Sequence, residues 1–228
     1  MALALCGCER IPEGERLIPT EEEVSGNRTH VLLEFTGFRC VNCPTAAQTA
    51  QTLLDLYGDH LTVVALHPAS NPFTQGKYDY TCPAADSIYR YMGGTASTPF
   101  PTGNIDLKAV NGQWFFDHEE WPAQVSRAME DSLFPPLSRL KDYRTAYWLV
   151  EDSVSGVQAM PDGSVNMNYY HRHLLRAVSD VPDMPVPDGC NPDRCTLLKL
   201  IIDNTDNHIM NVYETKLLDA PVESAVRH

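Results

Sequence analysis

The chain has 228 residues and a formal net charge of −13, with 17 Lys and Arg against 30 Asp and Glu. Clustered cations are needed to neutralise nucleic-acid phosphates, so the charge excludes a nucleic acid as the expected partner. A hydrophobic content of 43% supports a packed core in one large domain or two small ones. The seven cysteines are an odd number, so at least one lies outside any disulfide within the chain.

The first residues form a short apolar run that ends at Cys8. This run resembles the end of a bacterial lipoprotein signal, in which the cysteine after the cleavage site carries a lipid, and Cys8 is the expected attachment residue. The run is shorter than a full signal and has no cation before it. The Glu-rich stretch that follows predicts a flexible tether, so residues 1–29 are assigned to signal remnant, lipid attachment and tether. A frayed terminus with two free thiols is the alternative.

A β-rich apolar run at residues 30–36 leads into a Cys-x-x-Cys motif, Cys40 and Cys43. Apolar residues then recur at helical spacing over residues 46–57, and a continuous apolar run at residues 61–66 is typical of a buried parallel strand. The predicted order is therefore strand, Cys-x-x-Cys, helix, strand. A helix N-terminus carries partial positive charge, which favours a thiolate at Cys40.

This arrangement resembles the thioredoxin superfamily, in which a buried acid lies six residues before the first cysteine of the motif. The resemblance implies that Cys40 attacks a disulfide of a partner protein, that Cys43 resolves the mixed disulfide, and that Glu34 accepts a proton from Cys43. Arg39, beside the motif, would face the substrate. Thioredoxin has Asp in place of Glu34, Trp in place of Arg39 and Gly-Pro between the cysteines, so its redox potential does not transfer to this chain.

A second match to the superfamily is the sequence Thr-Pro-Phe-Pro-Thr-Gly at residues 98–103. Thioredoxin-like folds place a cis-proline opposite the cysteine motif, which implies that Pro101 orients the substrate and that Phe100 faces it. Pro99 is the alternative cis-proline, and an ordinary proline-rich turn explains the same residues.

Three more elements are expected before the chain changes character: a helix at residues 83–92, a strand at 113–116 and a helix at 122–133. Cys82 precedes the first of these helices and remains without an assigned role. With them, residues 30–134 are predicted to form an α/β thioredoxin-like domain.

The second half of the chain reads as strands separated by turn-rich segments; the expected strands are residues 143–151, 165–178, 195–203 and 208–217. They predict a small all-β, sandwich-like domain over residues 135–217, with fewer strands than a full sandwich has, and a tail at 218–228.

Two side-chain pairs in the second half need assignment. Cys190 and Cys195 bracket a turn-like loop, which in an oxidising compartment predicts a local structural disulfide. His171 and His173 would lie on one face of a strand, as two metal ligands do, and Glu151 or Asp152 is a candidate third ligand. Two histidines on a strand face are more often solvated or hydrogen-bonded, so neither a metal nor a cofactor is expected.

The order of the whole chain resembles thioredoxin-like outer-membrane lipoproteins of the Bacteroidetes, on the motifs at residues 32–44 and 100–104 and on residues 149–152, 161–163 and 170–176. The resemblance implies an exported, lipid-anchored protein of the cell envelope that exchanges thiols and disulfides with partner proteins. The rival is a non-catalytic surface binding or assembly lipoprotein, with Cys40–Cys43 as a fixed staple. A cytosolic peroxidase-like thiol enzyme without an anchor is a third interpretation.

Overall fold

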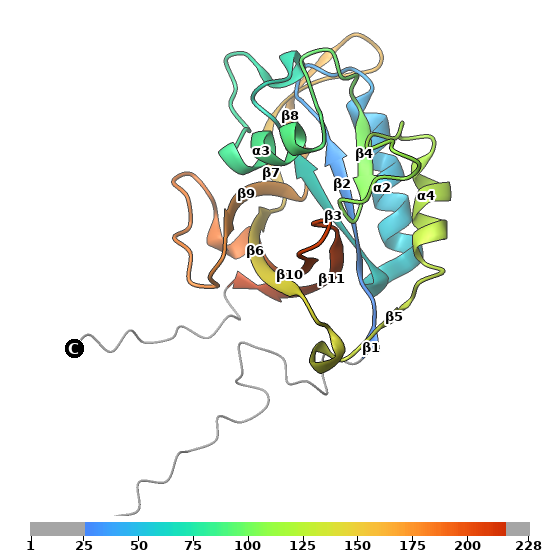
Figure 1. The fold of residues 1–228 in the computed structure, drawn as a ribbon. Coiled ribbons are helices and arrows are strands. Elements are labelled where there is room, and N and C mark those ends of the chain that lie inside the picture. The colour runs from blue at the N-terminus through green and yellow to red at the C-terminus, as the bar shows by residue number, and fades with distance from the viewer. Residues whose placement is uncertain (1–25, 218–228) are drawn as a thin grey trace, which may run out of the picture.

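The computed structural model describes residues 26–217, and its main feature is a seven-stranded mixed sheet in the order β11-β10-β6-β9-β3-β2-β4 (Figure 1). The strands of this sheet are β2 His30–Phe35, β3 Leu61–Leu66, β4 Thr102–Ile105, β6 Tyr143–Glu151, β9 Leu174–Ser179, β10 Cys195–Asp203 and β11 Ile209–Lys216. Two separate antiparallel pairs are β1 Gly26–Asn27 with β5 Leu133–Phe134, and β7 Val154–Ala159 with β8 Val165–His171. The helices are α2 Cys43–Tyr57, α3 Pro83–Tyr91 and α4 Trp121–Ala128.

Every residue of β2 and β3 is buried, which is why most of their side chains are apolar and why Glu34 of β2 is a buried acid. Successive side chains of a strand point to opposite faces. Leu32 of β2 packs with Ala46, Ala50 and Leu53 of α2 and with Trp121 of α4, whereas its neighbours belong to a core on the other face. Helices α2 and α4 therefore cover one face of the sheet (Figure 1).

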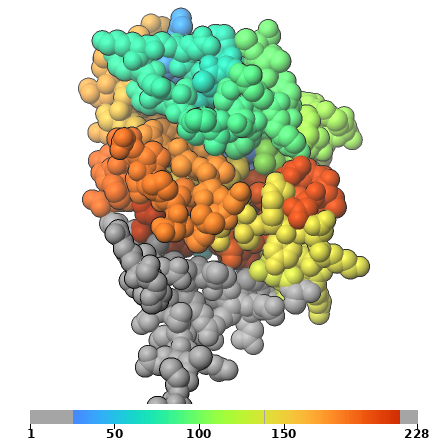
Figure 2. All heavy atoms as spheres, turned by 60° about the vertical axis from the view of Figure 1, so that its left-hand side comes forward, coloured from blue at the N-terminus to red at the C-terminus, as the bar shows by residue number. Residues whose placement is uncertain are grey.

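The other face is covered by α3 and by the C-terminal strands, which curl back over it (Figure 1). The curl brings β11, at one edge of the sheet, against β2 near the opposite edge. The backbone N–H of Ile209 donates to the carbonyl of Asp106, just after β4, at 2.7 Å. Strand β9 joins the halves of the sheet, because it pairs with β6 and, in parallel, with β3 at Ala65 and Leu174. In the space-filling view the α3 segment and the β9 segment lie side by side on one face (Figure 2).

The mixed α/β architecture expected from the sequence is confirmed. A sandwich over residues 135–217 is not confirmed, because four strands of this region belong to the same sheet as β2 and β3. The division of the chain at residue 134 stays a prediction.

Several element bounds differ from the predicted ones. The expected strand at 113–116 is reduced to isolated bridges of Phe116 with Gly103 and of Gln113 with Val110. The expected strand at 165–178 is two strands, β8 and β9, that separate at His173, whose φ is 54°. The predicted lipid-attachment residue Cys8, most of the predicted tether and the tail at 218–228 lie outside the described residues. Among residues 26–217, no helix has the length and apolar character needed to cross a membrane.

Candidate redox site and the adjoining cleft

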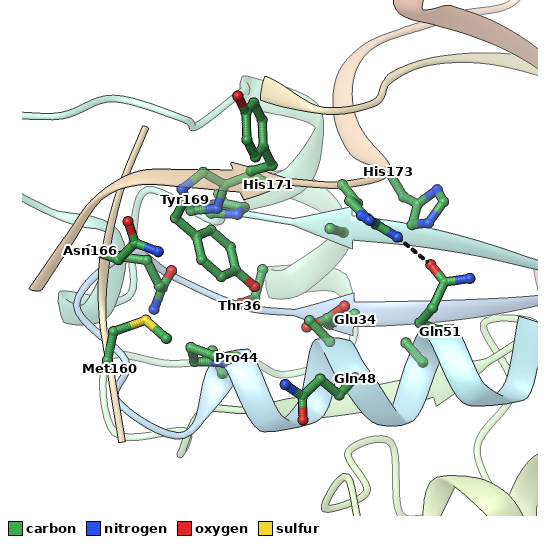
Figure 3. A pocket seen from close by; sticks show the side chains of 18 of the residues that line it. Glu34, Thr36, Pro44, Gln48, Gln51, Met160, Asn166, Tyr169, His171 and His173 are labelled. Carbon is green, nitrogen blue, oxygen red and sulfur yellow. Dashed lines mark hydrogen bonds between the residues drawn. The ribbon is translucent and has the colours of Figure 1, made fainter. Parts of the chain in front are cut away.

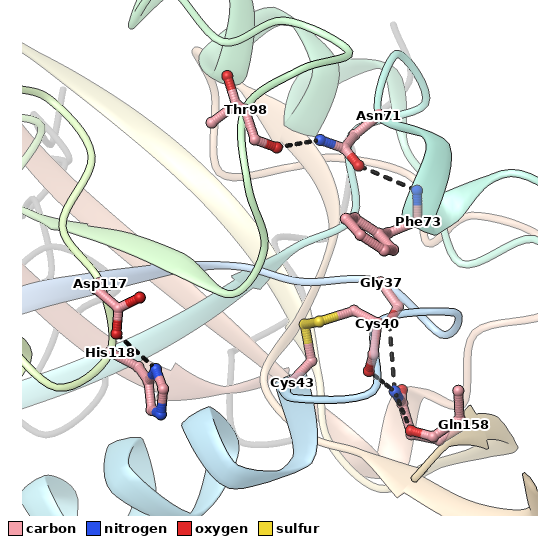
Figure 4. Close-up of a disulfide and its surroundings, with 10 residues drawn as sticks. Gly37, Cys40, Cys43, Asn71, Phe73, Thr98, Asp117, His118 and Gln158 are labelled. Carbon is pink, nitrogen blue, oxygen red and sulfur yellow. Dashed lines mark hydrogen bonds and ion pairs between the residues drawn. A yellow bond between two sulfur atoms is a disulfide. The ribbon is translucent and has the colours of Figure 1, made fainter. Parts of the chain in front are cut away.

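A disulfide joins Cys40, in the turn after β2, to Cys43, the first residue of α2 (Figure 4). The Cα atoms of the two residues are 5.4 Å apart. Each cysteine is only 2% exposed. The exposed residues of the motif are Val41 and Asn42, between the cysteines. The motif lies at the start of a helix, as the sequence predicted. The structure adds that both cysteines are buried in the core and not exposed at the surface.

The turn that carries Cys40 is held by two other segments. The N–H of Arg39 donates to the carbonyl of Phe73 at 3.0 Å, and Gly37 lies so close to this carbonyl that a Cβ would come within 2.5 Å of its oxygen. On the other side, the buried Gln158 amide of β7 donates to the Cys40 carbonyl at 2.8 Å (Figure 4). Strand β7 was not predicted from the sequence, and neither was the role of Gln158 as a support of the turn.

The residues expected to face a substrate have different surroundings. The peptide bond between Phe100 and Pro101 is cis, and Pro101 is buried. The Phe100 ring is also buried, stacked on Phe73 with ring centroids 6.0 Å apart. Arg39 is exposed and donates to the carbonyl of Gln75 at 3.3 Å. Of the three side chains, only that of Arg39 is open to a partner, and the roles assigned to Phe100 and Pro101 stay predictions.

A cleft of about 470 Å³ lies between α2 and strand β8, and Glu34, Cys43 and His67 are among the residues that line it (Figure 3). Glu34 projects from β2 and is 5% exposed. Burial raises the pKa of the Glu34 carboxyl to about 8, because the charged form loses its hydration. The acid predicted from the sequence therefore shares a cavity with the cysteine whose proton it is expected to take.

Buried aromatic and imidazole rings form the end of the cleft near β8. The ring centroids of His67 and His171 are 5.5 Å apart, and those of Tyr80 and His171 are 4.4 Å apart. Burial, with smaller contributions from His171 and Arg176, lowers the pKa of His67 well below its ordinary value, and burial lowers the pKa of His171 to about 4. Both imidazoles are neutral at pH 7. Burial, with a smaller contribution from Glu34, raises the pKa of Tyr169 to about 12.

The histidine pair predicted to share a strand face is split by the end of β8. The Nε2 atom of His171, the last residue of β8, lies 3.2 Å from the carbonyl of Val157. His173 lies in the short connection between β8 and β9 (Figure 3). A closer group of metal-binding side chains is Asp203, Asp206 and His208, in the turn between β10 and β11. Asp203 already accepts bonds from Thr205, and Asp206 one from His208, so local turn contacts account for this group.

The structure does not contain the predicted Cys190–Cys195 disulfide: both residues are free thiols in it. Cys190 Sγ accepts a hydrogen bond from Arg176 Nε at 2.9 Å. Cys195 begins β10, where its thiol donates to the Asn191 carbonyl at 3.3 Å. Cys82 is a free, buried thiol as well. Its helix N-terminal position does not favour the thiolate, because burial outweighs the local N–H groups and raises the pKa of the thiol.

Alkylation with iodoacetamide at pH 8 is expected to modify Cys190 about tenfold faster than Cys195, because reactivity follows exposure and thiolate content. Cys195 is 1% exposed, and burial raises the pKa of its thiol to about 11. Peptide mass spectrometry at timed quenches measures both rates, and the same reaction in urea, where the two rates should converge, is the control. A linked Cys190–Cys195 peptide in the untreated protein would contradict the structure.

No protein-family model matches the chain, and no curated protein matches its sequence. Among solved structures, HBP35 of Porphyromonas gingivalis is similar with a TM-score of 0.65 and 15% sequence identity, over 90% of this chain and 80% of that one. A protein of Agrobacterium tumefaciens covers 87% of this chain and 97% of its own at 13% identity, with a TM-score of 0.47, which is too distant to carry an argument. The likeness to HBP35 shows the fold alone, and its source, a member of the Bacteroidetes, fits the phylum that the sequence resemblance named.

Proposed function

We propose that this chain is a thioredoxin-like protein that exchanges disulfides with partner proteins through Cys40 and Cys43. The observation that carries the proposal is the cleft that brings the buried Glu34 carboxyl together with Cys43, directly behind the strand–Cys-x-x-Cys–helix turn. The envelope location and the lipid on Cys8 belong to the same proposal and rest on the sequence.

The chemistry follows from the positions of the three groups. In the reduced protein, the Cys40 thiolate attacks a partner disulfide, one partner sulfur leaves as a thiolate, and a mixed disulfide forms on Cys40. The Cys43 thiolate then attacks Cys40 Sγ and releases the second partner thiolate, so two electrons pass from the cysteine pair to the partner. Cys43 must lose a proton to attack, and a carboxyl whose pKa is about 8 is well matched to receive a proton from a thiol near pH 7–8.

The surface beside the disulfide is suited to a polypeptide partner. Val41, between the cysteines, is 45% exposed, and Phe73, which packs on the turn, is 37% exposed. Large apolar side chains at a surface mark contact sites when they are grouped. A partner segment that covers them would come close to Cys40.

A second candidate function is favoured by one observation, the burial of both cysteines. A disulfide that is never reduced would hold the turn in one conformation, and the protein would then be a non-catalytic binding or assembly module. Structural disulfides have reduction potentials below about −300 mV, whereas exchange proteins lie near −270 to −120 mV.

Redox titration of the Cys40–Cys43 pair, followed by a thiol-trapping gel shift, separates the two candidates. The exchange function predicts a midpoint above about −280 mV. It also predicts that insulin is reduced in the presence of a dithiol by the wild type and not by Cys40→Ser. A midpoint potential below about −300 mV, with wild type and Cys40→Ser equally inert towards insulin, would indicate that the disulfide is structural and that the protein is a binding or assembly module.

A further inference from the structure

The disulfide has two unlike sides, and only one of its residues lines the cleft. Cys43 lines the cavity between α2 and β8, together with Pro44 and Gln48 of the helix, whereas Cys40 does not. Which sulfur of a disulfide is attacked depends on access. A molecule bound in the cleft therefore lies beside Cys43, the residue that the exchange mechanism otherwise reserves for resolving a mixed disulfide.

The size of the cleft restricts what can reach Cys43 by this route. A volume of about 470 Å³ is that of a small-molecule site. One wall is helix α2 and the other is strand β8, with Glu34 and Thr36 at the floor (Figure 3). A folded protein cannot enter such a space, and a molecule of the size of an amino acid or short peptide can.

The polar groups of the cleft are arranged for a ligand. His67 is 2% exposed, lines the cleft, and neither of its ring nitrogens has a hydrogen-bond partner in the protein. An unpaired buried polar group is costly, and a bound molecule that pairs with it recovers that cost. The amides of Gln48 and Asn166 line the walls, and the exposed guanidinium of Arg172 lies on the rim, bonded to Gln51 at 2.7 Å. Amides and a guanidinium bind peptide and carboxylate groups.

We propose that the cleft admits a low-molecular-weight thiol of the amino-acid or short-peptide class, which reacts with the protein disulfide at Cys43. The proposal rests on the exchange function and deepens it, since it assigns partner proteins to Cys40 and the small thiol to Cys43. The protein would then pass electrons from small thiols, on one side of the disulfide, to polypeptide disulfides on the other.

The reaction balances with two molecules of the small thiol. The first, as a thiolate, attacks Cys43 Sγ; the bond between the two cysteine sulfurs breaks, and Cys40 leaves as a thiolate that takes up a proton. A mixed disulfide now links the small molecule to Cys43. The second thiolate attacks the small molecule's sulfur, the small disulfide departs, and the Cys43 thiolate receives a proton from Glu34.

Glutathione disulfide is the probe, and its adducts are located by peptide mass spectrometry. In Cys40→Ser only Cys43 of the pair is available, and in Cys43→Ser only Cys40. Adduct formation on Cys43 in the first variant is expected to be at least about tenfold faster than on Cys40 in the second. Gln48→Trp, which fills the cleft from α2, should slow the Cys43 reaction by about tenfold or more, whereas Thr52→Trp, an exposed position on the same helix outside the cleft, should not change it.

A second measurement does not need the serine variants to fold. In it, Gln48→Trp and Thr52→Trp are made in the chain that keeps both cysteines, and the rate at which glutathione reduces the Cys40–Cys43 disulfide is compared. Adducts confined to Cys40, or equal rates for Gln48→Trp and Thr52→Trp, overturn the small-thiol site while leaving exchange with proteins intact. If glutathione does not reduce the oxidised Cys40–Cys43 pair and a protein disulfide does not oxidise the reduced pair, the exchange function is overturned, and the small-thiol site with it.

Discussion

Replacing Glu34 by Gln is expected to raise the free energy of unfolding by about 3 kcal/mol at pH 7 and, in the same protein, to slow disulfide exchange. Burial raises the pKa of the carboxyl from 4.5 to about 8, so between these values the folded protein holds a proton that the unfolded chain has lost. The stability that this group contributes is therefore fully present below pH 4.5. It is lost as the pH rises towards 8, at about 1.4 kcal/mol per pH unit.

The expected gain follows because Gln has nearly the shape of the protonated acid and does not titrate. Urea unfolding of the oxidised wild type and of Glu34→Gln should give nearly equal free energies at pH 4.5 and a difference that grows to pH 8. Glu130→Gln, at an exposed position, is the matched control and should show no such pH dependence. A difference that is constant from pH 4.5 to pH 8.5 contradicts the raised pKa.

The exchange rate gives the second reading of the same variant. If Glu34 receives the proton of Cys43, the wild-type rate should change with pH around 8 and the Glu34→Gln rate should lose that step. A variant that is more stable and also exchanges at the wild-type rate, with the wild-type pH profile, would show that Glu34 has no part in the reaction. Stability gained at the cost of activity is what a functional buried acid predicts.

The strands that the sequence predicted best are those whose pattern depends on burial alone. The structure gives β6 and β10 the bounds expected for them, residues 143–151 and 195–203, because apolar side chains fill most of their length. Strand β7 was missed because Gly156 interrupts its pattern. A glycine is required there, since a Cβ would lie 1.8 Å from the Tyr80 hydroxyl.

The candidate site also contains residues that the sequence predicted and residues that it did not. Cys40, Cys43 and Glu34 lie within ten residues of one another, so their spacing along the chain was enough to suggest their chemistry. Gln158 and His67 reach the site from β7 and from the end of β3, and only the packing of the hairpin β7–β8 over α2 makes a cleft between them. No spacing in the sequence encodes that packing. The structure does not contain the predicted Cys190–Cys195 disulfide, and each thiol has another partner: Cys190 accepts from Arg176, and Cys195 donates to the backbone carbonyl of Asn191.

Asp106→Ala is expected to cost about 3 kcal/mol of stability, because it removes a buried carboxylate from its ion pair with Arg28 and leaves the Val31 N–H without its acceptor. Arg28 keeps Asp131 as a second partner. Asp106 is 4% exposed. Its Oδ2 atom lies 3.2 Å from Arg28 Nη2 and 2.6 Å from His30 Nδ1, and its Oδ1 atom accepts the N–H of Val31 at 2.8 Å. The residue also has a φ of 57°, which Asp and Asn tolerate better than Ala.

The loss should act on the curled sheet as a whole. The backbone of Asp106 accepts the N–H of Ile209, and Arg28 donates to the Ile209 carbonyl at 3.2 Å, so this network ties β2, the end of β4 and the start of β11 together. Urea unfolding measures the cost. Asp106→Asn keeps the shape and the backbone conformation, so its smaller loss isolates the contribution of the charge.

Arg90→Ala is the matched control, because it breaks an ion pair at the surface. Arg90 Nε lies 2.6 Å from Asp86 Oδ2, but the Arg90 side chain is 65% exposed, and such pairs contribute less than about 1 kcal/mol. If Asp106→Ala and Arg90→Ala cost the same, the buried network does not hold β11 against β2. The contact of β11 with β2, which curls the sheet, would then depend on apolar packing alone.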